Sequence, residues 1–165
     1  MTTTRLEVER PIAASPAAIF GLLCDPKGHV AIDASGMLMD ATGDPVTAVG
    51  DQFVVHMDRE SLNDYPMGRY DVEVTITTFV PDGEIAWTVV GTIRPPIGHV
   101  YGYTLVPIEG GTLVTSYYDW SSIDPVWKDS AIFPVISEGA LRATLGIMAR
   151  TVAPAGFTDT VSAHP

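Results

Sequence analysis

Residues 70–91, YDVEVTITTFVPDGEIAWTVVG, decide how this chain folds. From Tyr70 to Ile76 every second residue is apolar and each residue between them is Asp, Glu or Thr, which is the period of a strand with one buried and one wet face. The turn Pro81-Asp82-Gly83 then reverses the chain into a second strand. Because so short a connection can join only antiparallel neighbours, the sequence predicts an antiparallel sheet with one buried face.

Strands of the same kind are predicted on both sides of this hairpin. The predicted strands are 3–12, 37–41, 52–59, 68–80, 84–91, 100–108 and 112–120. Two short helices are expected between the first two strands. Ser15 as N-cap and Pro16 in the first turn favour one helix, Asp25-Pro26 ends it, and the second runs from Pro26 to Ile32.

A single long helix is predicted from Pro125 to Ala153, because this stretch lacks strand-like alternation and contains good helix formers. Pro134 is expected to kink it or restart it. The buried face of the sheet must be covered, and only this helix is long and apolar enough to do so. The prediction is therefore an α+β protein, with a curved antiparallel sheet of about seven strands around a C-terminal helix. Residues 1–153 form one domain and 154–165 a frayed tail.

Composition limits the partners. The chain has 165 residues, with 9 Lys and Arg against 20 Asp and Glu, so its formal net charge is −11 and nucleic acid is an unfavourable partner. No stretch reaches the ~18 uncharged apolar residues of a membrane span, and the N-terminus lacks the apolar core of a secretory signal. The one cysteine, Cys24, cannot form an intrachain disulfide. We therefore expect a cytoplasmic protein without membrane insertion.

Three segments resemble a known superfamily. They are VERPIAASPAAIFGLLCDP (8–26), TTFVPDGEIAW (77–87) and YTLVPIEGGTLVTSYYDW (103–120). Together with the terminal amphipathic helix they resemble the START-like, or SRPBCC, superfamily over residues 5–152, and within it the polyketide cyclase/dehydrase group. The resemblance implies a helix-grip fold with a cavity between sheet and helix for lipids, sterols or polyketides, and no metal or organic cofactor.

Strand alternation nominates the residues that would line such a cavity. The predicted inward side chains are Phe53, Val55, Met57, Tyr70, Val72, Val74, Ile76, Ile85, Trp87, Val89, Tyr101, Tyr103, Leu105, Val114, Ser116, Tyr118 and Trp120. Many are aromatic with polar tips, which suits an apolar ligand, although the same residues would also serve as plain core. Asp33 and Ser35 are either caps of a turn or polar contacts at the rim.

Few residues suggest acid–base chemistry. The histidines, His29, His56, His99 and His164, lack metal-site spacing, and a structural or solvent-facing role is expected for each. His56 points outward by alternation, but a bulge would turn it inward as a general base. Glu138, in the middle of the predicted helix, is either exposed or a cavity proton donor. Arg69 is expected at the surface, unless a twist of the strand end brings it to an enolate or carboxylate.

Three functions follow from these residues. The first is a carrier or sensor that binds a hydrophobic small molecule, and the second is a polyketide cyclase/dehydrase-type enzyme that uses pocket Tyr, His or Glu side chains. The third is a protein-interaction module. A buried ionisable pair within hydrogen-bonding distance would distinguish the enzyme from the carrier, and a large exposed apolar patch would favour the third function. The chain is expected to be a monomer or a homodimer.

Overall fold

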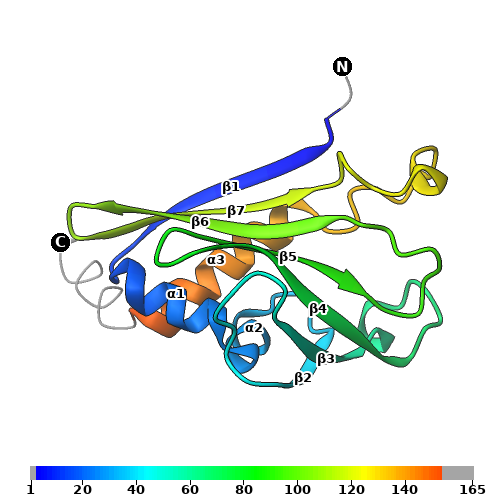
Figure 1. Cartoon of the computed structure of the whole chain (residues 1–165), viewed down its shortest axis with the longest axis horizontal. Coiled ribbons are helices and arrows are strands. Elements are labelled where there is room, and N and C mark those ends of the chain that lie inside the picture. Colours follow the sequence, from blue (N-terminus) through cyan, green and yellow to red (C-terminus); the bar gives the residue numbers. More distant parts are fainter. Residues whose placement is uncertain (1–2, 154–165) are drawn as a thin grey trace, which may run out of the picture.

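A computed structural model describes residues 3–153, so the predicted tail 154–165 lies outside the described residues. Within this range seven strands form one antiparallel sheet in the order β1-β7-β6-β5-β4-β3-β2 (Figure 1). The strands are β1 (Arg5–Ile12), β2 (Leu38–Thr42), β3 (Gln52–Asp58), β4 (Arg69–Val80), β5 (Glu84–Val90), β6 (Val100–Ile108) and β7 (Gly111–Asp119). All seven predicted strands are confirmed, with boundaries shifted by at most two residues.

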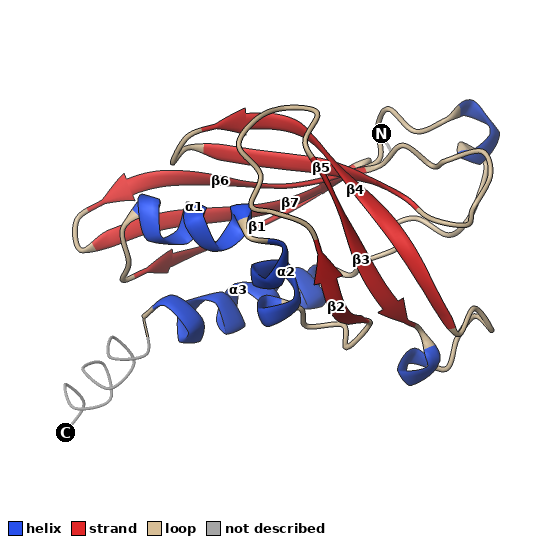
Figure 2. Cartoon of the chain, turned by 60° about the horizontal axis from the view of Figure 1, so that its bottom comes forward, coloured by secondary structure: helices blue, strands red, loops and turns tan. Residues whose placement is uncertain are grey.

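Three α-helices of the described chain cover the concave face of the sheet (Figure 2). They are α1 (Pro16–Cys24), α2 (Pro26–Ile32) and α3 (Glu138–Val152), and two short 3-10 turns span Glu60–Leu62 and Pro125–Trp127. The first two helices start as predicted: Ser15 Oγ accepts a hydrogen bond from Ala18 N at 3.1 Å, and Asp25 Oδ1 accepts one from Lys27 N at 3.0 Å. The helix-grip α+β fold is confirmed.

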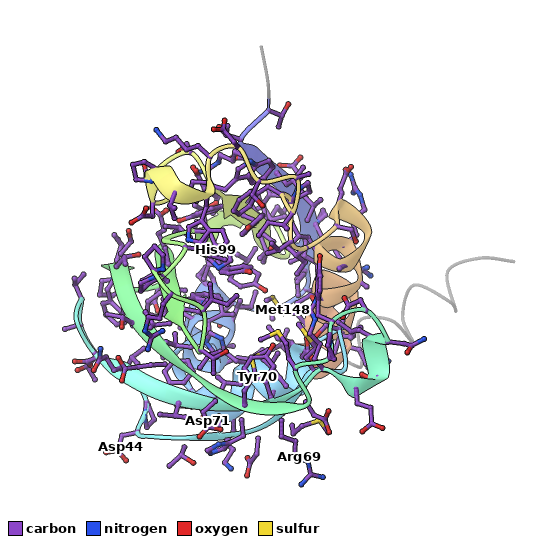
Figure 3. All side chains as sticks on the ribbon, turned by 90° about the vertical axis from the view of Figure 1, so that its right-hand side faces the viewer. Asp44, Arg69, Tyr70, Asp71, His99 and Met148 are labelled. Carbon is purple, nitrogen blue, oxygen red and sulfur yellow. The ribbon has the colours of Figure 1, made fainter. Side chains whose placement is uncertain are left out.

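The helices join the two edges of the sheet. Helix α3 contacts β1 and β7 at one edge, α2 contacts β2 at the other edge, and α2 also contacts α3. Seen end-on, the strands and helices form a ring (Figure 3). Met148 of α3 is fully buried and points into this ring. The helices therefore bridge the two edges of the sheet across its concave surface, here called the inner face.

The predicted alternation places residues on the correct faces. Val74 and Ile76 on β4 are 3% and 1% exposed, whereas Glu73 beside Val74 is exposed. The register continues this pattern across the sheet, since Val74 pairs with Phe53 of β3 and with Val89 of β5. Apolar side chains that share a face and a row pack against one another, which stabilises the register.

The prediction of one helix from Pro125 to Ala153 is wrong in its first half. Only a 3-10 turn forms at Pro125, and α3 begins at Glu138. Ser137 is its N-cap, with Oγ accepting a hydrogen bond from Ala140 N at 3.1 Å. Pro134 lacks the N–H that a continuous helix needs. Tertiary contacts hold the intervening loop, because Trp127 Nε1 donates to the Pro95 carbonyl at 3.0 Å.

Candidate functional site

A row of aromatic side chains crosses the inner face and is called the aromatic wall below. It consists of Trp87 on β5, Tyr101 on β6, Tyr118 and Trp120 at the end of β7, and Phe133 in the loop before α3. The register creates the row, because Trp87 lies opposite Tyr101 and Tyr101 lies opposite Tyr118. From Trp87 to Phe133, successive ring centroids are 6.3, 4.8, 5.3 and 6.3 Å apart. The four ring pairs are stacked or tilted, with interplanar angles of 10° to 35°, so the rings face one another along the row.

The aromatic wall keeps contact with accessible space. Only Tyr118 is fully buried, and the other four side chains are half-buried. Within residues 3–153, the Tyr101 hydroxyl and the indole nitrogens of Trp87 and Trp120 have no hydrogen-bonding partner in the protein, unlike the indole of Trp127. No fully buried side-chain polar atom in this range lacks a partner, so these polar tips reach accessible space. Burial nevertheless raises the pKa of Tyr101, because its phenolate would be poorly solvated there.

His99 lies at the wall and is hydrogen-bonded to it. Its Nδ1 is 2.7 Å from the Tyr118 hydroxyl oxygen, and its ring contacts those of Tyr101, Tyr118 and Phe133 edge-on. The side chain is 5% exposed, and burial lowers the pKa of His99 to about 4. Figure 3 shows His99 inside the ring of strands. A neutral imidazole and a buried phenol therefore form an ionisable pair on the inner face.

His29 of α2 approaches the same wall from the helix layer. Its ring packs edge-on against Trp87 at 4.7 Å and against Phe53 at 5.0 Å between centroids. Nε2 donates to the Leu23 carbonyl at 2.8 Å, which fixes the tautomer. Burial lowers the pKa of His29, so this imidazole is neutral in the folded protein at pH 7.

The other predicted lining residues divide into core and rim. Phe53, Val55 and Tyr103 are buried in the hydrophobic core, and burial raises the pKa of Tyr103 to about 12. Met57, Tyr70 and Val72 are half-buried towards one end of β3 and β4. Tyr70 points into the ring in Figure 3. A hollow of about 320 Å³ at this end is also lined by His56, Arg69 and Asp71, so it opens on the outer side of the two strands and not in front of the aromatic wall.

Asp33 and Ser35 act together as a turn cap. The Asp33 carboxylate accepts hydrogen bonds from the backbone N–H groups of Ser35, Gly36 and Leu38 at 2.9 to 3.2 Å, and from the Ser35 hydroxyl at 2.7 Å. These bonds occupy both carboxylate oxygens. The structure thus places Asp33 in the local role that its sequence context predicts.

His56 and Glu138 lie away from the aromatic wall. His56 points to the outer face, where it contacts Thr42 Oγ1 at 2.8 Å and Asp71 Oδ1 at 2.7 Å, and Figure 3 shows Asp71 and Arg69 outside the ring. Glu138 is the first residue of α3, exposed and bonded to Arg142 at 2.8 Å. Its predicted position in the middle of a helix was wrong because the helix starts later.

Sequence reasoning missed His99 and Phe133 as site residues. Both lie in loops that have no hydrophobic period, so no pattern assigned them a face. What brings these two loops together is a tertiary hydrogen bond. Asp124 N donates to the Ile97 carbonyl at 2.9 Å and joins the His99 loop to the loop that carries Phe133. That contact spans 27 residues of sequence, which local pattern reading does not reach.

The structure also bears on metal, thiol and membrane chemistry. Among residues 3–153 no group of three His, Cys, Asp or Glu side chains is placed to hold a metal ion. Cys24 is buried in α1, and burial raises the pKa of its thiol to about 11, so it is a poor nucleophile. No helix in the described part of the chain has the length and apolarity needed to cross a membrane.

Comparison with known proteins shows the fold alone. No family model and no curated protein sequence matches this chain. Among solved structures, a protein from Chromobacterium violaceum has a TM-score of 0.66 at 14% identity, covering 90% of this chain and 96% of that one. An Aha1 dimer from Colwellia psychrerythraea has a TM-score of 0.62 at 16% identity, covering 91% and 96%. An AHSA1-like protein from Aeromonas hydrophila has a TM-score of 0.59 at 18% identity, covering 92% and 94%.

These neighbours identify the class of fold. Aha1-like proteins have the SRPBCC-type helix-grip fold, so the predicted similarity to that fold is confirmed at the level of architecture. The neighbour from Colwellia psychrerythraea was solved as a dimer. At 14 to 18% identity the likeness carries no information about ligand or reaction.

Proposed function

We propose that this protein binds an apolar small molecule, as a carrier or sensor, in front of the aromatic wall. One observation carries the proposal: inward-facing Trp and Tyr side chains keep accessible surface and polar tips without protein partners. Ligand sites combine mostly apolar walls with a few such orienting polar groups. The predicted single domain of residues 1–153 is retained as part of the proposal.

Two variants of adjacent valines on β5 test the site. Val89 is on the inner face, in the same strand as Trp87, whereas Val90 pairs with Glu73 on the outer face. Val89→Phe adds volume in front of the wall and is expected to weaken ligand binding at least about 10-fold, because overpacking costs ~1–3 kcal/mol. Val90→Phe adds the same volume to the outer surface and is expected to bind like the wild type.

Native mass spectrometry measures this binding with a panel of fatty acids, sterols and naphthyl ketones, and tryptophan fluorescence gives the affinities. The proposal predicts a one-to-one complex with at least one class of compound. It fails if no compound binds, or if Val89→Phe and Val90→Phe bind equally well.

A second candidate is an enzyme of the cyclase/dehydrase type, and the His99–Tyr118 pair favours it. A buried ionisable pair within hydrogen-bonding distance is what such chemistry needs, and His99 would replace His56 and Glu138 as the acid–base group. This chemistry would need the tautomer in which Nδ1 donates to the Tyr118 oxygen, so that the bare Nε2 could take a proton from a C–H bond next to a carbonyl group. The resulting enolate oxygen would then be held by nearby donors.

Hydrogen–deuterium exchange separates the carrier from the enzyme. The methyl ketone acetylnaphthalene is incubated with the protein in deuterated water, and incorporation of deuterium into its acetyl group is followed by mass spectrometry. A carrier leaves the exchange rate at that of the buffer. An enzyme accelerates exchange, and His99→Phe abolishes the acceleration.

A further inference from the structure

The two ring nitrogens of His99 have different surroundings. Nδ1 is bonded to the Tyr118 hydroxyl at 2.7 Å, whereas Nε2 has no protein partner among the residues described. Because every fully buried side-chain nitrogen in that range has a partner, Nε2 must reach accessible space. The Thr88 hydroxyl donates to the His99 carbonyl at 2.9 Å, which holds the backbone at this residue, while the bond to Tyr118 orients the imidazole. One nitrogen of an imidazole that lies inside the ring of strands and helices is thus free to bind a group other than the protein's own side chains.

The tautomer of His99 determines whether its Nε2 donates or accepts a hydrogen bond. A phenol is a stronger proton donor than a neutral imidazole, and a bare imidazole nitrogen is the stronger acceptor, so the favoured bond runs from the Tyr118 O–H to Nδ1. Tyr118 keeps its proton, since burial raises the pKa of its hydroxyl. With Nδ1 acting as acceptor, the proton of neutral His99 is on Nε2. His99 therefore presents an N–H donor to the interior.

The charged side chains near the aromatic wall determine which kind of ligand oxygen can accept a hydrogen bond from His99. Arg59, which influences Tyr101 electrostatically, is held by both carboxylate oxygens of Asp64 at 2.8 and 2.7 Å. Arg5 is bonded to Glu7 and Asp119 on the outer side. Both of these cations are therefore already paired with carboxylates, and the chain carries a net charge of −11. A carboxylate would be poorly stabilised there, whereas a neutral oxygen costs little to desolvate.

We infer that His99 Nε2–H is the hydrogen-bond donor for a neutral carbonyl or phenol oxygen of a flat aromatic ligand stacked on the aromatic wall. Tyr118, the fully buried member of the wall, is a positioning residue, because its hydroxyl fixes the tautomer and orientation of His99. This inference rests on the proposed binding function and adds to it the group that orients the ligand. It also states which ligands are disfavoured, namely carboxylates and purely hydrocarbon molecules.

A pair of isosteric ligands tests the donor. Acetylnaphthalene and isopropenylnaphthalene have nearly the same shape, but only the ketone accepts a hydrogen bond. The wild type is expected to bind the ketone about 3- to 10-fold more tightly, the equivalent of one net hydrogen bond. His99→Phe should reduce this ratio to about one, and His99→Gln, which retains an N–H donor, should restore part of it. His56→Phe, on the outer face, is the matched control and should leave the ratio unchanged.

Infrared spectroscopy of the bound ketone gives a second readout, and its first measurement uses the wild-type protein alone. The carbonyl stretch of acetylnaphthalene in the wild-type complex should lie at lower wavenumber than in hexane. It should return towards the hexane value in His99→Phe, and Tyr118→Phe should broaden it because the tautomer is no longer fixed. A purely structural role of Tyr118 would not change the band.

The possible outcomes distinguish a failure of this inference from a failure of the proposed binding function. Equal affinity for ketone and alkene in the wild type overturns the inference, as does a preference that survives in His99→Phe, since the donor would then be Tyr101 or an indole. Binding of fatty acids but of neither naphthyl compound overturns the inference and leaves the binding function intact. Binding of no compound overturns both.

Discussion

Gly28→Ala is expected to lower the free energy of unfolding by about 3 kcal/mol. Gly28 lies in α2 where the helix crosses the end of α1. A Cβ atom at this position would be 1.9 Å from the backbone oxygen of Leu22. A backbone atom cannot rotate away as a side chain can, so α1 and α2 would have to separate.

The same substitution is expected to disturb the contact between His29 and the aromatic wall. His29 follows Gly28 directly, and its bond to the Leu23 carbonyl depends on the same close approach of the two helices. Moving α2 outward would remove the His29 ring from Trp87. We therefore expect Gly28→Ala to weaken ligand binding as well as stability. Urea denaturation followed by tryptophan fluorescence measures the loss of stability. Ligand titration of the folded variant measures the loss of affinity.

Gly21→Ala is the control for this prediction. Gly21 is an exposed residue of α1, and nothing lies within 4 Å of the position that a Cβ atom would take there. Alanine is the better helix former by about 1 kcal/mol, so this variant should be as stable as the wild type or more stable. The argument about close helix packing is contradicted if Gly28→Ala unfolds at the same urea concentration as Gly21→Ala.

Acidification is expected to destabilise the protein between about pH 6.5 and pH 4. Burial lowers the pKa of His99 to about 4 and also lowers the pKa of His29. In the unfolded chain both imidazoles have a pKa of about 6.5. Below that pH the unfolded state binds protons that the folded state excludes, so stability is fully present above pH 6.5 and falls as the pH drops. For His99 the loss approaches about 3 kcal/mol.

The pH window distinguishes the histidines from the carboxylates. Asp64, whose pKa is lowered by its hydrogen bonds with Arg59, destabilises the fold only as the pH falls below about 4. The groups that face His99 are Tyr118 and Tyr101, which stay neutral throughout this range. Thermal melts at half-unit pH steps measure the slope. His99→Phe should flatten it between pH 6.5 and 4, and an unchanged slope in both His99→Phe and His29→Phe would contradict the prediction.

The sequence was sufficient to predict the sheet, because the patterns that specify each strand and turn lie within a few neighbouring residues. Alternation from Tyr70 to Ile76 and the turn at Pro81 fix two strands and their faces, and the same pattern places Trp87, Tyr101 and Tyr118 inward. Once the register is set, these three residues form a row, since cross-strand neighbours on one face must meet. Most of the aromatic wall could therefore be predicted.

The C-terminal region shows where this reasoning stops. Helix formers and the absence of alternation predicted a helix from Pro125, yet α3 starts only at the Ser137 cap. The residues before it are held by long-range bonds, such as that between Trp127 and Pro95, which outweigh weak helix propensities. Glu138 consequently moved from a candidate cavity residue to the exposed first turn of α3.

The sequence by itself determined the strands, their turns, their faces and the two first helices, because each depends on neighbours a few positions away. Only the tertiary structure decided where the loops go. It brought His99 to Tyr118 and Phe133 to Trp120, residues 19 and 13 positions apart in sequence but in contact in space. Such contacts depend on how two loops close one end of a curved sheet, and no periodicity in either loop encodes that geometry.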